Sequence, residues 1–405
     1  MLEEITTSNK KSSIRPVEAA LLFITGFFGL SALSSRITGL LGIPYFIEIY
    51  FVPIALYYLV RFSRKTLKNH EVEHGQWNGF LLLMLLMAFL SLSTIIGIVN
   101  MGDVYNVVTC IRPFVYLLLA AFIFSRERVK VDIYIVYIVV SGTLCGEVAA
   151  KIIFRSIEDI TFLNTSALAA FVLIPFVKRN KALIVASLCF GLAVATMTLY
   201  RRILLTYLLA AVSGLLFFFS RQKFGRKVLG LIFLLLIGYF VYVNYTDLMQ
   251  WLIDFLGIDN SGDYYLSASW RLVEGIASDR AHSEQITEIF STFSQSILPQ
   301  GPVGKLQNFG YYSDTSYKFL YDTFGSVLAW ILVIACMGRA ALCFIRTFTI
   351  AKLDEEYLLS GLYVPVVCEF LIFDGTFCTF ANASLVAGFL VSGWFRAPRI
   401  INEEN

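Results

Sequence analysis

Twelve runs of mostly apolar residues follow one another along the 405-residue chain. A helix that crosses the hydrocarbon core of a bilayer needs about 20 such residues. The runs lie near 17–33, 39–60, 77–98, 106–125, 131–150, 161–177, 182–199, 203–219, 228–244, 317–338, 356–374 and 380–395. They predict an all-α polytopic membrane protein with about 12 transmembrane helices.

The composition agrees with this prediction. Hydrophobic residues make up 58% of the chain, charged residues 15%, and the mean hydropathy is +0.73. Soluble domains are roughly 45–50% apolar and about 25% charged. These values exclude a water-soluble globular enzyme, a disordered chain and a nucleic-acid-binding protein.

The basic residues indicate how the predicted helices are oriented. The segments 10–15, 61–68, 126–130, 178–181, 221–227, 339–352 and 396–399 carry 22 of the 32 lysines and arginines, and they alternate with segments that carry few. Because cytoplasmic loops are enriched in Lys and Arg, we expect both termini in the cytoplasm of a bacterial cell, in the inner membrane. The first sixteen residues are polar and lack a small-residue cleavage site, so the first span is expected to be retained.

One connection is far longer than the others and lies on the non-cytoplasmic side. It divides the chain into helices 1–9 (1–244), a large periplasmic loop (245–316), and helices 10–12 with a cytoplasmic tail (317–405). A connection of this length in a compact protein is usually functional or separately folded. Near its start, Leu248, Trp251 and Phe255 share one helical face. This pattern over 246–257 predicts a helix that either lies flat on the membrane or packs on top of the bundle.

Arg201 and Arg202 break the charge pattern, because they fall on the non-cytoplasmic side between two short spans. One interpretation is that they anchor lipid headgroups by snorkelling. The other is an anion site, since guanidinium groups match phosphate oxygens in a bidentate fashion and stay charged at any pH.

Two further clusters lie in the long loop. Trp270 and Arg271 begin a predicted helix, and Arg280 and His282 follow; a solvated loop helix with local ion pairs is the alternative. The second cluster leads into the tenth span and combines hydroxyls, a carboxylate and cations; it comprises Gly301, Gly304, Lys305, Tyr311, Tyr312, Asp314, Tyr317 and Lys318. No strand precedes the two glycines, so they do not form a nucleotide fingerprint.

Charged residues inside or beside the apolar runs form a third group of candidates, because their burial is costly unless they are paired. The glutamates among them are expected to pair with an intramembrane partner such as Arg112, for structure or for function. The group consists of Arg36, Glu48, Arg112, Glu147, Lys151, Arg155, Asp322, Glu369 and Asp374.

The cysteines and histidines predict neither disulfides nor a metal site. Most of the seven cysteines lie in or beside apolar runs without a CxxC spacing, and His70, His74 and His282 are scattered. We therefore expect buried small hydrophobic cysteines and no metal or other cofactor.

This combination resembles the O-antigen polymerase and ligase superfamily, the Wzy-like and WaaL-like bacterial membrane glycosyltransferases. The resemblance covers most of the chain by topology, and by motif about residues 195–220 and 265–330. In motif, 198–205 is similar to the family's helix that opens with an arginine, and Arg271 matches a second family arginine. Gly301 and Gly304 resemble the family turn, Tyr317 the aromatic, and Gly325 a glycine within the next helix.

The resemblance implies a GT-C-like fold and glycosyl transfer from undecaprenyl-pyrophosphate-linked glycans, without metal or nucleotide sugar. The chain departs from the family in one respect, since Asp314–Thr315 occupies the place of a His-Asn pair. Ligases depend on that histidine, so its absence favours a polymerase of lipopolysaccharide O-antigen or a similar surface polysaccharide.

The implied mechanism gives each candidate a role. Asp314 and Arg271 are the expected catalytic residues, with Asp314 as general base. The pyrophosphate is bound by Arg201, Arg202, Arg271 and Arg280, and the glycan by Trp270, Tyr311, Tyr312 and Tyr317. The expected partners are lipid-linked donor and acceptor, with a chain-length regulator and a flippase as further partners. A lipid-linked glycan flippase or transporter, and an O-antigen ligase, remain the alternatives.

Overall fold

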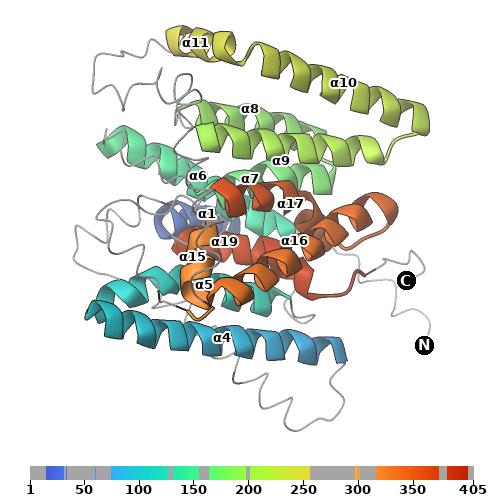
Figure 1. Ribbon diagram of the computed structural model, residues 1–405. Coiled ribbons are helices and arrows are strands. Elements are labelled where there is room, and N and C mark those ends of the chain that lie inside the picture. Colours follow the sequence, from blue (N-terminus) through green and yellow to red (C-terminus); the bar gives the residue numbers. More distant parts are fainter. Residues whose placement is uncertain are drawn as a thin grey trace.

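The computed structural model describes residues 15–31, 33, 60, 74–125, 131–154, 164–197, 201–255, 297–299, 301, 316–373 and 381–399. Within these residues the regular structure is helical and contains no strand. The helices pack into a bundle in which most of them run in roughly the same direction or its reverse (Figure 1). The predicted all-α class is therefore confirmed.

The helices follow the apolar runs with shifted ends. They are α1 (Pro16–Ile24) with the π-helix η1 (Thr25–Leu30), α4 (His74–Met101), α5 (Val104–Phe124), α6 (Ile133–Phe154), α7 (Thr165–Lys178), α8 (Lys181–Met197), α9 (Arg201–Ser220), α10 (Phe224–Val243), α11 (Tyr245–Phe255), α15 (Ser316–Phe324), α16 (Ser326–Thr349), α17 (Glu355–Phe373), α19 (Ala381–Val391) and the 3₁₀-helix η5 (Ser392–Phe395).

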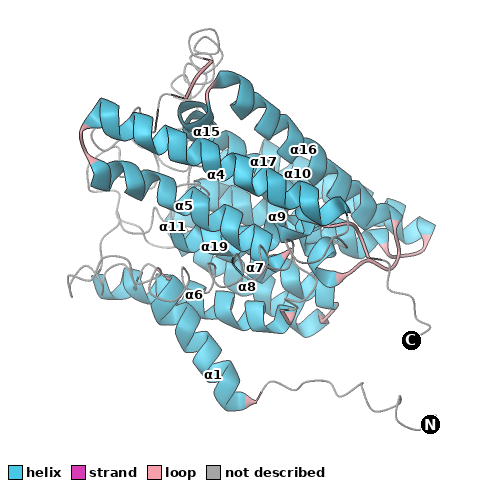
Figure 2. Ribbon diagram, turned by 90° about the horizontal axis from the view of Figure 1, so that it is seen from below, coloured by secondary structure: helices cyan, strands magenta, loops and turns pink. Residues whose placement is uncertain are grey.

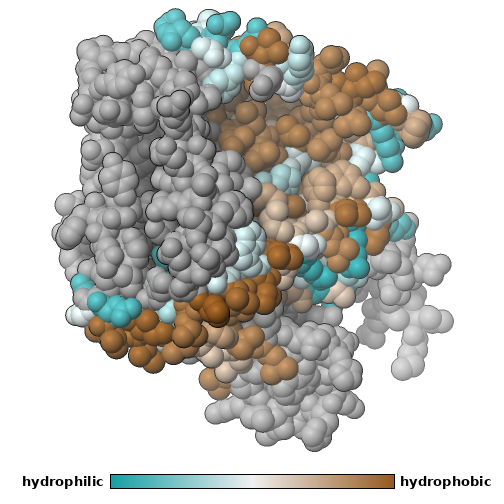
Figure 3. All heavy atoms as spheres, in the orientation of Figure 1, coloured by the Kyte–Doolittle hydropathy of each residue, from teal (hydrophilic) through white to brown (hydrophobic). Residues whose placement is uncertain are grey.

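Five of the described helices are long and apolar enough to cross a membrane, namely α4, α6, α9, α10 and α16. Apolar side chains cover the outside of α10 and α4 (Figure 3). On α10, Leu229, Leu235 and Tyr239 are among many large exposed side chains, and few of its residues are buried inside the protein. A surface of this kind is suited to lipid, so the chain is a membrane protein.

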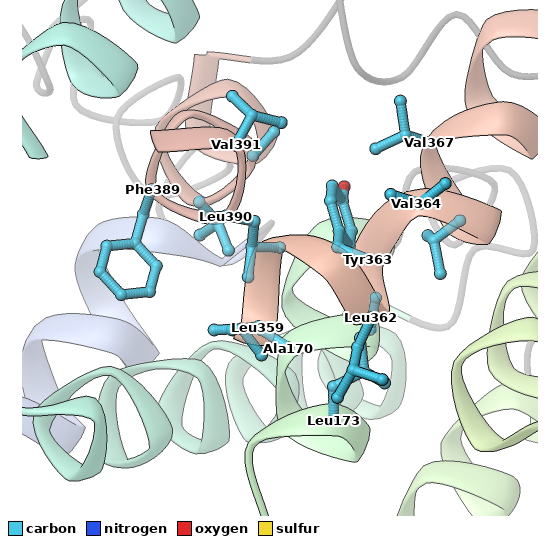
Figure 4. Packing of buried hydrophobic residues seen from close by; sticks show 14 of the residues in the cluster. Ala170, Leu173, Leu359, Leu362, Tyr363, Val364, Val367, Phe389, Leu390 and Val391 are labelled. Atoms are coloured by element: carbon cyan, nitrogen blue, oxygen red, sulfur yellow. The ribbon is translucent and has the colours of Figure 1, made fainter. Parts of the chain in front are cut away.

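α7 lies at the centre of the bundle and packs against α6, α8, α9, α17 and α19. Each residue from Thr165 to Val177 is buried. Ala170 and Leu173 of α7 face side chains of α17 such as Leu359 and Leu362 (Figure 4). Because α7 is apolar on all sides, it has no solvent-facing stripe, which is typical of a helix enclosed by other helices.

Small residues bring α1 and η1 very close to α6. A Cβ atom at Gly146 would lie 2.5 Å from the carbonyl oxygen of Phe27, and one at Gly142 would collide with the carbonyl oxygen of Phe23. Gly26 of η1 meets the α6 backbone at Val139 in the same way. Close backbone contact through small residues spaced four apart is a frequent mode of helix association in membranes.

The tenth predicted span, 317–338, is wrong as a single helix. The chain forms the short helix α15, turns at Gly325, and continues as α16 to Thr349. Gly325 has φ of 78° and ψ of 167°, a conformation that is essentially restricted to glycine and costs other residues about 1–3 kcal/mol, so a helix ends here. Gly325 is therefore a junction between two helices, not a glycine within one. Arg339 and Arg346, expected in a loop, lie inside α16.

Candidate functional site

Ion pairs join several helix ends at one end of the bundle. Lys178, at the end of α7, contacts Glu355 of α17 at 2.7 Å and Asp132, just before α6, at 4.0 Å. Arg396, after η5, pairs with Asp354 at 3.4 Å and with Glu356. We call this group of residues the charged belt.

Two further arginines extend the belt by binding main-chain carbonyls. Arg221, after α9, donates from Nη2 to the carbonyls of Thr347 and Ile350 at 2.9 and 2.8 Å. Burial, and then the nearby charge of Arg179, lower the pKa of Arg221. Arg339 donates to the carbonyl of Trp394 at 2.5 Å and to that of Arg396 at 2.6 Å. The charged belt thus joins helix ends that the pattern of basic loops predicted to lie on the same side of the membrane.

The opposite end of the bundle holds the starts of α7 and α9. Both helices run toward the belt, since α7 ends at Lys178 and α9 ends just before Arg221. They pack against each other, and a Cβ at Gly214 of α9 would meet the ring of Phe176 of α7. Twelve residues before Phe176 is Asn164, and twelve residues before Gly214 is Arg202. By this register the two helices begin at about the same level of the bundle.

This level lies deep in the bundle. The 14 residues of α7 extend about 21 Å from the belt at 1.5 Å per residue. The hydrocarbon core of a bilayer is about 30 Å thick. Measured from Lys178, the starts of α7 and α9 therefore lie about 10 Å short of the opposite membrane surface; measured from Arg221, the 20 residues of α9 extend about 30 Å and reach that surface.

Asn164 forms the N-cap of α7, and the sequence reasoning did not single it out. Its Oδ1 accepts a hydrogen bond from the main-chain N–H of Ala167 at 2.9 Å. The side chain is 3% exposed, and within the described part of the chain its Nδ2 has no hydrogen-bond partner. An Asn-Thr pair before a short apolar run is a helix-start signal; it gives the capping role but not the unpaired donor.

The return end of the long connection packs into the same side of the bundle. Gly301, with φ of 80°, touches α4, where a Cβ at position 301 would lie 2.6 Å from the Cα of Gly97. A Cβ at Gly325 would collide with the carbonyl oxygen of Ile297. Ile297 therefore lies against the junction of α15 and α16, and Gly301 lies against α4.

α15 reaches the middle of α5 and runs across the direction of α4 in Figure 1. The ring of Phe324, its last residue, lies 5.6 Å from the ring of Phe114, centroid to centroid. Phe114 is ten residues from the start of α5, which is about 15 Å along that helix. Asp322 and Thr323 of α15 are buried at this depth. α4 and α5 lie side by side in front of it (Figure 2).

The predicted site residues are described only in part. Arg201 and Arg202 form the first turn of α9, and Tyr317 is the second residue of α15; for these three the structure describes the backbone. Outside the described residues lie Trp270, Arg271, Arg280, Tyr311, Tyr312 and Asp314. The convergence of the arginines on one site therefore stays a prediction. Of the expected helix 246–257, α11 accounts for Tyr245–Phe255.

Among the other charged candidates, Glu147 of α6 and Asp322 of α15 are buried, and Arg112 of α5 is partly buried. The backbones of Lys151 and Glu369 lie in α6 and α17, while Arg36, Glu48, Arg155 and Asp374 lie outside the described residues. The pairing of a glutamate with Arg112 stays a prediction. Among the described residues, no group of three or more His, Cys, Asp or Glu side chains is placed to hold a metal.

The comparisons with known proteins identify no relative: no family model, no curated protein and no solved structure matches the chain.

Proposed function

We propose that the chain is a polysaccharide polymerase of the Wzy type with a GT-C-like arrangement of about 12 spans in the bacterial inner membrane. It would join undecaprenyl-pyrophosphate-linked repeat units on the periplasmic face. One observation carries the proposal. The last residues of the long connection pack against α4, at the end of the bundle where α9 begins with two arginines.

The depth of α15 supports a site of this kind. Non-helical backbone at membrane depth is tolerated only where protein surrounds it or where it lines a water-filled cavity. Here Gly301 lies against α4, and the junction at Gly325 lies against Ile297 and Leu298. A polymerase needs a site that opens to both bilayer and water, because the lipid tails of its substrates stay in the bilayer while their glycans stay in water.

The chemistry that we assign uses no metal. A hydroxyl of the acceptor repeat unit attacks the anomeric carbon of the donor's reducing-end sugar. The bond from that carbon to the pyrophosphate oxygen breaks, and undecaprenyl pyrophosphate leaves. Asp314 takes the hydroxyl proton, a role that contributes about 10²–10⁴-fold. Displacement in one step inverts the anomeric centre.

Arg201, Arg202, Arg271 and Arg280 would stabilise the charge that builds up on the leaving pyrophosphate. Removal of one donor from such a site costs about 2.7–4 kcal/mol of transition-state stabilisation. Trp270, Tyr311, Tyr312 and Tyr317 would stack on sugars. The amphipathic helix α11 would border the path by which lipid enters.

The test is polymerisation by purified full-length protein supplied with two lipid-linked oligosaccharides. We expect products longer than either substrate, and loss of these products in Arg201→Ala and Arg271→Ala. Arg226→Ala is the matched control, since Arg226 is exposed at the opposite end of the bundle, in the first turn of α10. A flippase would move substrate across the membrane without lengthening it, and a ligase would transfer it to a different acceptor. Either result, or unchanged product in both variants, would contradict the proposal.

A further inference from the structure

The side-chain Nδ2 of Asn164, at the N-terminal end of α7, has no hydrogen-bond partner among the residues that the structure describes. Its Oδ1 accepts a hydrogen bond from the Ala167 N–H. If the side-chain amide were flipped, its NH₂ group would face the Ala167 N–H, and two donors would meet. The Nδ2 group must therefore occupy the other side of the amide, at the end of α7. It is buried, and none of the described residues offers it an acceptor, so a donor in this position is available to a bound ligand.

The surroundings of this amide favour a negatively charged acceptor. The N-terminal end of a helix carries a partial positive charge and free main-chain N–H groups, which makes it an anion site. α7 and α9 run in the same direction with their starts at one level, by the register of Phe176 and Gly214. Two packed helices therefore present their positive ends at one level of the bundle, and the residues that open α9 are Arg201 and Arg202.

The length of α7 gives this place its depth. The 14 residues of this helix place its positive end about 21 Å from Lys178, on the side of the bundle away from the belt. An anion that binds there must reach into the bundle from the side opposite the belt. The headgroup of a lipid that stays in the outer leaflet has this reach.

We propose that Asn164, together with the starts of α7 and α9, forms the part of the site that holds the diphosphate of a polyprenyl-pyrophosphate lipid. This inference deepens the proposed function and rests on it. In it Asn164 Nδ2 donates a hydrogen bond to a phosphate oxygen, while Oδ1 keeps its capping bond to Ala167. Asn164 is thus a binding residue that the arginine pattern alone does not reveal.

Two substitutions separate the binding role of Asn164 from its capping role. Asn164→Asp keeps an oxygen for the Ala167 N–H, removes the amide donor and adds a negative charge. Asn164→Ser also keeps a capping oxygen and replaces the amide donor with a shorter hydroxyl, which does not extend to the position of Nδ2. It adds no charge, which matters because Glu147 is buried on the neighbouring helix α6. Both are favourable N-cap residues, so the helix start should remain intact.

The structure provides a matched control for these variants. Asn180 caps α8 with the same geometry, since its Oδ1 accepts from the Leu183 N–H at 3.3 Å. It lies two residues after Lys178, at the end of the bundle that carries the belt. Asn180→Asp therefore makes the same chemical change at a cap far from the proposed site.

The experiment measures binding of undecaprenyl pyrophosphate to detergent-solubilised full-length protein by native mass spectrometry, with undecaprenol and inorganic pyrophosphate as separate probes. A hydrogen bond to a charged group corresponds to about tenfold or more in affinity. We expect Asn164→Ser to weaken binding of undecaprenyl pyrophosphate about tenfold, Asn164→Asp to weaken it further, and Asn180→Asp to leave it unchanged. Undecaprenol should bind equally to all variants.

The outcomes separate this inference from the proposed function. Unchanged binding in both Asn164 variants, or an equal loss in Asn180→Asp, overturns the diphosphate site even if the wild type polymerises. If the Asn164 variants lose binding but the wild type does not lengthen its substrates, the diphosphate site is supported and the polymerase function is overturned. If inorganic pyrophosphate binds with the same dependence on Asn164, the anion site is supported, and free pyrophosphate is a ligand of it as well as the lipid.

Discussion

The Cα of Gly97 lies so close to Gly301 that a Cβ atom at position 301 would approach it to 2.6 Å, and the Gly97 nitrogen to 2.7 Å. Gly97 belongs to α4, and Gly301 belongs to the return end of the long connection. Two backbones from distant parts of the sequence therefore meet without side chains between them. This contact fixes where the connection re-enters the bundle.

Gly301→Ala should disturb this contact specifically. An alanine with φ of 80° costs about 1–2 kcal/mol, and its methyl group would displace the α4 backbone. We expect a lower thermal midpoint in detergent and a loss of polymer product beyond that expected from the midpoint. Gly238→Ala is the control, because a Cβ at Gly238 meets nothing within 4 Å and alanine favours a helix. Equal midpoints for both variants would show that the contact does not position the connection.

The sequence predicted the helical class and the charged belt because both depend on local patterns. Apolar runs and basic loops are read directly from residue types, and Lys178, Arg221 and Arg396 all lie where the pattern put them on a single side. The break at Gly325 was not predicted, since hydropathy continues across it; only a positive φ in contact with Ile297 requires it. Asn164 and the start of α9 lie at one level because of the register in which α7 and α9 pack, and no local sequence pattern encodes that register.

The glycines between α1–η1 and α6 should govern the stability of the first helix. Gly142→Leu would push the α6 backbone away from Phe23, and Gly146→Leu would do the same at Phe27. We expect each to lower the thermal midpoint and to increase proteolysis between α1 and α4. Gly338→Leu in α16, where a Cβ meets nothing within 4 Å, is the matched control. If all three variants behaved alike, close packing of α1 on α6 would not be the cause.

Arg221 should stabilise the belt through its two bonds to the end of α16. Hydrogen bonds to a charged group contribute about 1.5–3 kcal/mol each, and since Arg221 is only partly buried we expect Arg221→Gln to lose about 1–2 kcal/mol in total. Lysine should restore part of this loss, because it keeps the charge but not the planar fork of donors. The measurement is the thermal midpoint in detergent, with Arg226→Gln as the control. A loss in the control equal to that of Arg221→Gln would assign the effect to net charge alone.

Reporter fusions should place the two ends of α10 on opposite sides of the membrane. Gln222 lies beside Arg221 in the belt, whereas Asp254 lies in α11, beyond the far end of α10. Since basic loops are cytoplasmic, green fluorescent protein fused after Gln222 should fluoresce, and alkaline phosphatase fused after Asp254 should be active. The reverse fusions serve as controls and should both be inactive. If one of the two reporters were active at both fusion sites, α10 would not cross the bilayer. The start of α9 and the belt would then not face different compartments, and a diphosphate site supplied from the outer leaflet would lose its basis.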